Sequence, residues 1–217
     1  MHARGNEMEQ LKLEIESRSL FEQITNPEEL TRAYKAVKAN KGAPGVDGIT
    51  VEAFGENLQE EITRLREEVT TWTYRPQPVR RVMIPKPGST KERPLGIPCV
   101  RNRVVQYAMK AVLEPIYEKD FSDSSYGFRP KRKQQQALER AKALVQEGKE
   151  WVVDIDLENF FGTINHDRLM ATLAKKISDK RVLKLIGMTL RSGAMVNRTL
   201  EPTKEGSVQG SPLSPLL

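Results

Sequence analysis

Two carboxylates placed two positions apart, Asp154 and Asp156, are the residues of this sequence best suited to do chemistry. They lie in the run 151–157, whose valines and isoleucine favour a strand. Because side chains alternate between the two faces of a strand, both carboxylates are expected on one face. Such oxygen ligands can bind a divalent metal ion, and the alternative is a pair of edge-strand acids balanced by Lys or Arg.

The charge of the chain points to a polyanionic partner. Its 217 residues include 35 Lys and Arg against 29 Asp and Glu, which gives a formal net charge of +6. Such an excess is typical of nucleic-acid binding, although it can also serve solubility. The single cysteine excludes an internal disulfide, and no apolar run has the length of a membrane span or a signal peptide. We therefore expect a cytoplasmic protein with no membrane partner.

The most basic part of the chain, residues 75–103, is expected to contain a β-hairpin. Apolar triplets at 82–84 and 95–97 flank a turn rich in Pro, Gly and Ser. Cations on a stiff hairpin that faces the acidic strand could bind a nucleoside triphosphate, and the alternative is a solvated charge run. The cations are Arg75, Arg80, Arg81, Lys86, Lys91, Arg93, Arg101 and Arg103.

A second basic segment, 124–133, interleaves the aromatic residues Tyr126 and Phe128 with cations. Aromatic rings can stack on bases, and neighbouring guanidinium groups can bind phosphates, which are the two requirements of a nucleic-acid groove. The alternative is that both rings belong to the hydrophobic core. The cations concerned are Arg129, Lys131, Arg132 and Lys133.

Helical patterns surround these segments. Asn26 and Pro27 have the N-cap and first-turn chemistry of a helix that ends near Lys41, before a Gly- and Pro-rich loop at 40–48. We expect His166 to cap its helix or to form a local hydrogen bond. Further helices are predicted at 51–70, 104–117, 134–146, from 166 onward and at 182–191, followed by a hairpin-like stretch at 194–204.

Five blocks, taken in order, resemble the amino-terminal half of a group II intron-encoded reverse transcriptase, also called a maturase. They are residues 40–48, 80–98, 125–130, 151–161 and 206–217, so the resemblance covers the chain from about residue 20 to its end. One such match would be weak, whereas five in the right order are strong.

The resemblance implies an α/β right-hand polymerase fold with fingers, an incomplete palm and no thumb. It divides the chain into a variable segment at 1–19, the N-terminal extension and fingers at 20–98, and the incomplete palm at 99–217, with further fingers elements around 166–205. The apolar Pro-Leu-Leu end indicates a piece of a longer protein. An exposed strand edge would then favour self-association of the piece.

The same resemblance assigns roles to single residues. It selects Asp156 over Asp154 as the catalytic, metal-binding aspartate, and it makes Phe161 the gate against a ribose 2′-hydroxyl. Lys86 and Arg93 would clamp the triphosphate of the incoming nucleotide. The remaining assignments are Gln209 and Gly210 under the sugar and base of the nucleotide, and Arg80, Arg81, Arg129, Lys131 and Arg132 along the nucleic acid.

The sequence departs from the family pattern at two positions. Gly162 stands where Phe-Phe-Asp is common, which would loosen the junction after the acidic strand. Val208 stands where Pro-Gln-Gly is frequent, which would cost only rigidity of the turn.

The implied activity is RNA-directed DNA synthesis, in which an RNA template directs extension of a DNA primer with deoxynucleotides, together with assistance to intron splicing and mobility. Two Mg²⁺ ions would be needed, and the remaining carboxylates are expected beyond residue 217, so this piece should have little activity alone. Two alternatives stay open: a non-catalytic maturase fragment that binds intron RNA, and a related retroelement or CRISPR-associated reverse transcriptase.

Overall fold

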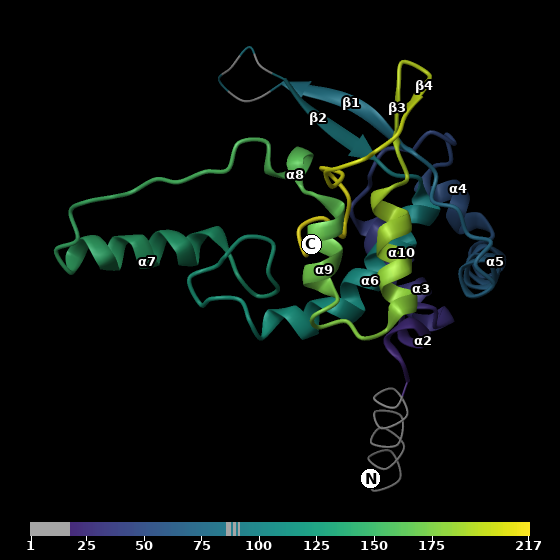
Figure 1. Ribbon diagram of the computed structural model, residues 1–217, viewed down its shortest axis with the longest axis horizontal. Coiled ribbons are helices and arrows are strands. Elements are labelled where there is room, and N and C mark those ends of the chain that lie inside the picture. The colour runs from purple at the N-terminus through teal and green to yellow at the C-terminus, as the bar shows by residue number, and fades with distance from the viewer. Residues whose placement is uncertain (1–17, 86–87, 89, 91) are drawn as a thin grey trace, which may run out of the picture.

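A layer of helices carries a small sheet at one end and a long arm at its side (Figure 1). The computed structural model describes residues 18–85, 88, 90 and 92–217. The strands are β1 (Val79–Pro85), β2 (Glu92–Ile97), β3 (Ala194–Val196) and β4 (Thr199–Glu201). The helices are α2 (Leu20–Ile24), α3 (Pro27–Ala39), α4 (Val51–Glu56), α5 (Leu58–Thr70), α6 (Val100–Glu118), α7 (Gln134–Gln146), α8 (Phe160–Thr163), α9 (His166–Leu173) and α10 (Lys180–Leu190).

Helix starts follow the local capping chemistry. The Asn26 side chain accepts a hydrogen bond of 2.8 Å from the Glu28 N–H, and Pro27 occupies the first turn of α3, as predicted. The single helix predicted at 51–70 is wrong, because Asn57 leaves the helical conformation (φ −118°, ψ 41°) and separates α4 from α5. The break lets the two short helices present separate apolar faces to the core.

The core is built around α6, which packs against α2, α3 and α4. Val104, Ala108, Met109 and Leu113 of α6 are fully buried. α5 is amphipathic, because Ile62, Leu65 and Val69 are buried while the opposite face is polar. α10 closes the other side of this layer and contacts α9 and α2.

The sheet joins two distant parts of the chain in the order β2-β1-β3-β4. β1 and β2 pair antiparallel with Arg80 opposite Ile97, which confirms the predicted hairpin. β3 and β4 form the short second hairpin predicted at 194–204. A parallel pairing of Val79 with Ala194 connects the two hairpins, so β1 is fixed by both neighbours.

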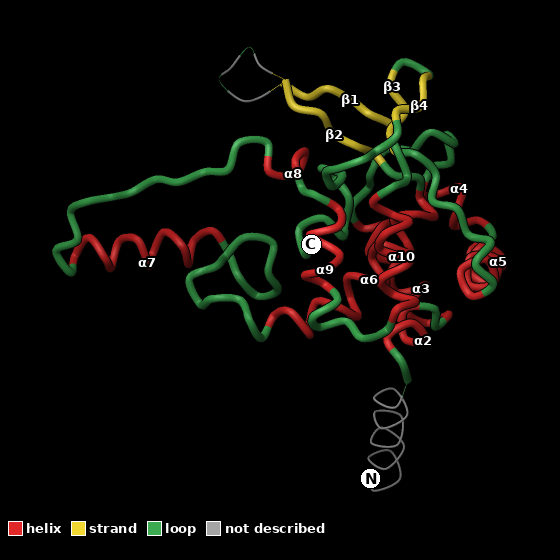
Figure 2. Tube along the Cα trace, in the orientation of Figure 1, coloured by secondary structure: helices red, strands yellow, loops and turns green. Residues whose placement is uncertain are grey.

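The arm consists of α7 and the segment 147–158, which returns toward the body as loop (Figure 2). α7 buries no residue. The predicted strand at 151–157 is wrong for this structure, because the segment forms no backbone hydrogen bond with any described residue. A strand needs a neighbour to satisfy its N–H and C=O groups, and the described strands all pair elsewhere. The apolar side chains of the segment 151–157 are consequently exposed, and Trp151 is 94% exposed.

Two of the predictions concern residues that the structure does not describe. The variable segment predicted at 1–19 falls almost wholly outside the described residues, and Lys86 also lies outside them.

Among the described helices, none combines the length and apolar character needed to cross a bilayer.

Candidate functional site

The segment 206–210 lies against α8, and this contact is made by backbone groups. The Ser207 N–H donates to the Phe161 carbonyl oxygen at 2.6 Å, and the Gly206 N–H donates to the Ile164 carbonyl oxygen at 2.7 Å. Gly206 has φ +86°, and a Cβ added there would lie 2.8 Å from the Gly162 carbonyl oxygen. Two blocks that are far apart in the sequence therefore meet so closely that only glycine fits.

His166 also stabilises the junction between α8 and the segment 206–210. Its ring is buried, and Nε2 donates to the Gly206 carbonyl oxygen at 2.7 Å. The predicted capping or local role of His166 is wrong, because Asn165 caps α9 and the hydrogen bond of His166 reaches a residue of the distant 206–210 segment. The histidine instead ties the start of α9 to that segment.

The other side of the segment lies on β2. The Gly96 N–H donates to the Gln209 carbonyl oxygen at 2.8 Å. Gly210 has φ +105°, and a Cβ added there would lie 2.9 Å from the Gly96 carbonyl oxygen. A Cβ on Gly96 would in turn lie 2.4 Å from Cγ1 of Val208, so the side chain at the second departure from the family pattern packs directly on the hairpin.

The first departure, at Gly162, is also accommodated by local packing. A Cβ at this position would lie 2.5 Å from the side-chain amide of Asn159, whose own backbone is left-handed with φ +50°. The Asn159 amide therefore occupies the space beside Gly162.

A cavity of about 170 Å³ opens where these segments converge. It brings together three of the predicted site residues, Arg81, Phe161 and Gln209. Arg81 reaches it from β1, where its Nη1 also contacts Oε2 of Glu201 at 2.7 Å. Other parts of the wall come from Val79, Pro94, Gly96, Asn159, Gly162, Ala194, Thr203, Glu205, Gly206, Ser207 and Val208.

One residue of the predicted triphosphate clamp, Arg93, lies at the outer end of the same hairpin. Arg93 is exposed on β2 and pairs with Ile84 of β1, next to the hairpin turn. Lys86, its predicted partner, lies outside the described residues.

Asp154 and Asp156 are exposed on the arm. Within the described ranges, no group of three or more Asp, Glu, His or Cys side chains is placed to hold a metal ion. The two aspartates supply hard oxygen ligands of the kind that Mg²⁺ prefers, but they do not by themselves make a complete site. The described carboxylates therefore do not by themselves assemble a two-metal centre.

Arg80 is engaged inside the fold. Its Nε and Nη2 donate to the Pro44 carbonyl oxygen at 3.1 and 2.9 Å. Arg103 of α6 donates from Nη2 to the neighbouring Ala43 carbonyl oxygen at 2.9 Å, and burial lowers the pKa of its guanidinium. The Gly- and Pro-rich loop 40–48 is thus held between β1 and α6 by two arginines.

Arg129 is likewise directed inward. Its side chain is 6% exposed and forms a two-pronged contact with Glu118, with Nη2 at 2.7 Å and Nε at 3.1 Å from Oε1. The hydrogen bond from Arg129 lowers the pKa of the Glu118 carboxyl, and Glu118 raises the pKa of Arg129. Arg132 contacts Asp123 at 2.8 Å and lies over the Tyr126 ring, whereas Lys131 is exposed.

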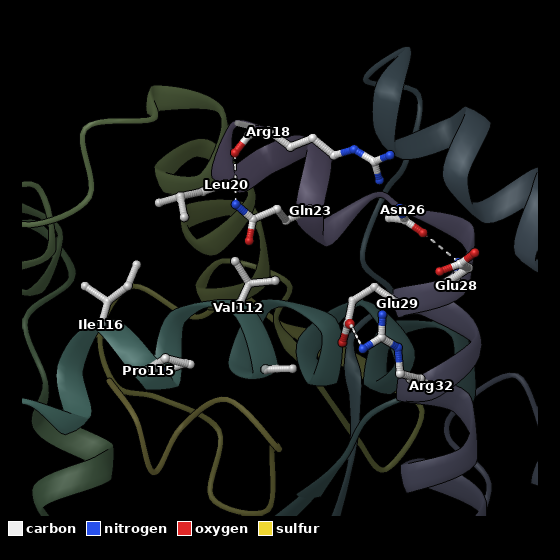
Figure 3. A pocket seen from close by; sticks show the side chains of 11 residues that line it. Arg18, Leu20, Gln23, Asn26, Glu28, Glu29, Arg32, Val112, Pro115 and Ile116 are labelled. Atoms are coloured by element: carbon white, nitrogen blue, oxygen red, sulfur yellow. Dashed lines mark hydrogen bonds and ion pairs between the residues drawn. The ribbon is translucent and has the colours of Figure 1, made fainter. Parts of the chain in front are cut away.

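A larger cavity of about 450 Å³ lies elsewhere, between α2, α3 and the end of α6 (Figure 3). Its floor is apolar, with Val112 and Ile116 of α6, and its rim carries the ion pair of Arg32 with Glu29 at 3.4 Å. None of the predicted site residues lines it.

Comparison with known proteins identifies the fold and the family. Residues 84–217 match the family described as reverse transcriptase (RNA-dependent DNA polymerase), and the chain belongs to this family. A solved partial Cas6-RT-Cas1--Cas2 complex has a similar fold, with a TM-score of 0.60 at 21% identity over 92% of this chain and 33% of that chain. The predicted α/β reverse transcriptase fold is thereby confirmed.

Relatives in sequence include proteins of group II introns. The chain is 38% identical over 200 residues to the group II intron-encoded protein LtrA of Lactococcus lactis subsp. cremoris. The aligned region covers 91% of this chain and 33% of LtrA. It is 40% identical over 204 residues to Protein YkfC of Escherichia coli K12, covering 91% of this chain and 53% of YkfC. These relatives confirm the predicted resemblance, and the chain spans about half or less of their length.

The structure therefore assembles part of the predicted site. Arg81, Phe161, Gln209 and Gly210 converge at the hairpin, whereas Asp156 lies on the arm. The sequence-based prediction missed the inward engagement of Arg80, because the accepting carbonyl belongs to a residue far away in the sequence.

Proposed function

We propose that this chain forms the fingers and part of the palm of an RNA-directed DNA polymerase encoded by a group II intron. The observation that carries this proposal is the convergence of Phe161, Gln209 and Arg81 around one cavity beneath the hairpin. The proposed division keeps residues 20–98 as N-terminal extension and fingers and residues 99–217 as palm, with fingers elements around 166–205.

In the proposed nucleotide site, the cavity receives the sugar and base of an incoming deoxynucleotide. Gln209 and Gly210 form the surface beneath it, and Phe161 excludes a ribose 2′-hydroxyl by its bulk. Arg93, next to the hairpin turn, would bind the triphosphate through its planar guanidinium, and Lys86 would add a compact ammonium charge. The RNA template and DNA primer would lie on the basic surface that includes Arg81 and Lys131.

Asp156 is proposed as one metal ligand of this polymerase, with the other carboxylates supplied by sequence beyond residue 217. Bound Mg²⁺ would neutralise the charge that develops on the phosphates during nucleotide transfer. In such an arrangement the segment 151–157 would pair as a strand, which would satisfy its free backbone groups and carry Asp156 into the cleft.

A second candidate function is binding of intron RNA without catalysis. It is favoured by the position of Asp156, which is exposed on the arm and belongs to no group of three or more potential metal ligands among the described residues. The net charge of +6 supports binding of RNA in either case. The exposed apolar side chains of the arm also support self-association of this chain, a proposal that sedimentation at rising concentration would test.

Photo-crosslinking distinguishes the two functions. The chain is mixed with a DNA primer annealed to an RNA template, and 8-azido-dATP is added opposite a template uridine. We expect a crosslink within residues 206–217 that depends on the template and is competed by dATP but not by ATP. Phe161→Ala should let ATP compete, whereas Leu200→Ala, at an exposed position of β4, should change nothing. RNA binding without a template-dependent crosslink would favour the second function.

A further inference from the structure

One aromatic side chain is displayed to solvent by an unusual backbone. Phe128 is 79% exposed, and its φ of +55° lies in the left-handed region that bulky side chains rarely adopt. Lys131, in the same turn, has φ +60°. Strained conformations of this kind persist where the surrounding structure holds them, and they concentrate at functional sites. The position of this turn, between α6 and α7, can be followed in Figure 1.

Arg129 holds this turn in place. In addition to its contact with Glu118, its Nη1 donates to the carbonyl oxygens of Ser122 and Ser125 at 2.6 and 2.9 Å. Its guanidinium also lies 5.3 Å from the centre of the Phe121 ring. Because every prong of Arg129 is used, the backbone of the turn next to Phe128 is fixed, while the Phe128 side chain stays exposed.

The turn that carries Phe128 also carries exposed cations, and a cavity lies beside it. Lys131 and Lys133 are exposed, and neither forms an ion pair with a described residue. A cavity of about 120 Å³ lies beside the ring and is walled by Phe128, Pro130 and Lys110. The two acids of this cavity are compensated, since Glu118 pairs with Arg129 and Glu114 pairs with Lys110 at 3.5 Å.

We propose that Phe128 is a stacking platform for an unpaired nucleobase of single-stranded RNA, with Lys131 and Lys133 contacting the phosphates on either side. The occupant is argued from two exposed cations of the same turn, Lys131 and Lys133, neither of which forms an ion pair with a described acid. An aromatic face between cations is the combination that binds single strands without reading their sequence. This inference rests on the proposed RNA-binding function and adds to it a contact outside the nucleotide site.

Two substitutions separate stacking from packing. Phe128→Gly removes the ring and also relieves the left-handed backbone, so its melting temperature should be equal to or above that of the wild type. Phe128→Tyr keeps an aromatic face. The matched control is Leu138→Ala, which removes an apolar side chain 63% exposed on α7 and should leave binding unchanged.

The probe is a fluorescent single-stranded RNA of about 12 nucleotides, together with the same strand carrying abasic sites, titrated by anisotropy at fixed salt. We expect Phe128→Gly to weaken binding of the intact RNA by roughly tenfold and to leave binding of the abasic strand unchanged, whereas Phe128→Tyr should bind like the wild type.

Three results would overturn the inference. Equal binding of the intact RNA by the wild type and Phe128→Gly would exclude a stacking role. A lower melting temperature of Phe128→Gly with unchanged affinity would make the ring a packing element. Absence of RNA binding by the wild-type chain would contradict the proposed function as well as this inference. This failure can be told from a failure of the inference alone, because it is seen in the wild type and not only in a comparison with Phe128→Gly.

Discussion

Substitution of Gly206 by alanine tests the junction on which the candidate site depends. The left-handed backbone at φ +86° costs an alanine about 1 kcal/mol relative to glycine. The new Cβ would also lie 2.8 Å from the Gly162 carbonyl oxygen and 2.9 Å from that of Phe161, so the segment must move away. Movement would weaken the hydrogen bonds to Ile164 and from His166, each worth about 1 kcal/mol. The expected loss of stability is therefore about 2–4 kcal/mol.

Gly48→Ala is the matched control. Gly48 also has a left-handed backbone, with φ +70°, but a Cβ added there would meet no atom within 4 Å. Only the backbone term of about 1 kcal/mol should then be lost. The difference between the two variants isolates the close contact of residue 206 with α8.

The assay is urea denaturation of both variants and the wild type, with thermal unfolding as a second measure. For a chain of this size, each 1 kcal/mol lowers the melting temperature by about 2–4 °C, so Gly206→Ala should lose roughly 4–16 °C. Equal losses for the two variants would refute the close approach of segment 206–210 to Phe161, and with it the geometry of the cavity.

Three further predictions follow from named contacts. Arg129 lowers the pKa of Glu118, so their ion pair stabilises the fold above the ordinary carboxyl pKa of 4.5. This stabilisation is lost as the pH falls below that value and Glu118 becomes protonated. Glu118→Gln should therefore flatten the acid limb of a curve of stability against pH. In a salt series of RNA affinity, Arg81→Ala should reduce the logarithmic slope by about one, whereas Arg80→Ala, whose guanidinium is bound to Pro44, should not. Leu113→Ala, in the fully buried core, should cost about 2–5 kcal/mol in urea denaturation, and a smaller loss would contradict the central position of α6.

Features set by neighbours in the sequence were predictable. The start of α3 depends on Asn26 and Pro27 alone, and the β1–β2 hairpin depends on two apolar triplets around one turn. The division at Asn57 was not predicted, because it lies in the backbone conformation of that one residue (φ −118°, ψ 41°), which the residue pattern of 51–70 does not mark.

Features set by distant partners were not predictable from residue patterns. The hydrogen bonds of His166 to Gly206 and of Arg80 to Pro44 join residues that no local pattern connects. The segment 151–157 has the alternation of a strand, yet pairing requires a second strand, and no described strand lies beside it. Resemblance to a family nevertheless selected Phe161 and Gln209, which the structure brings to one cavity.

The most direct test of the account is extension of a DNA primer on an RNA template by the natural gene product that contains this sequence, compared with its Asp156→Asn variant. The wild type should add deoxynucleotides as the template directs, and the variant should lose this addition while it still binds the primer–template. Continued synthesis by the Asp156→Asn variant would contradict the assignment of Asp156 to the polymerase site.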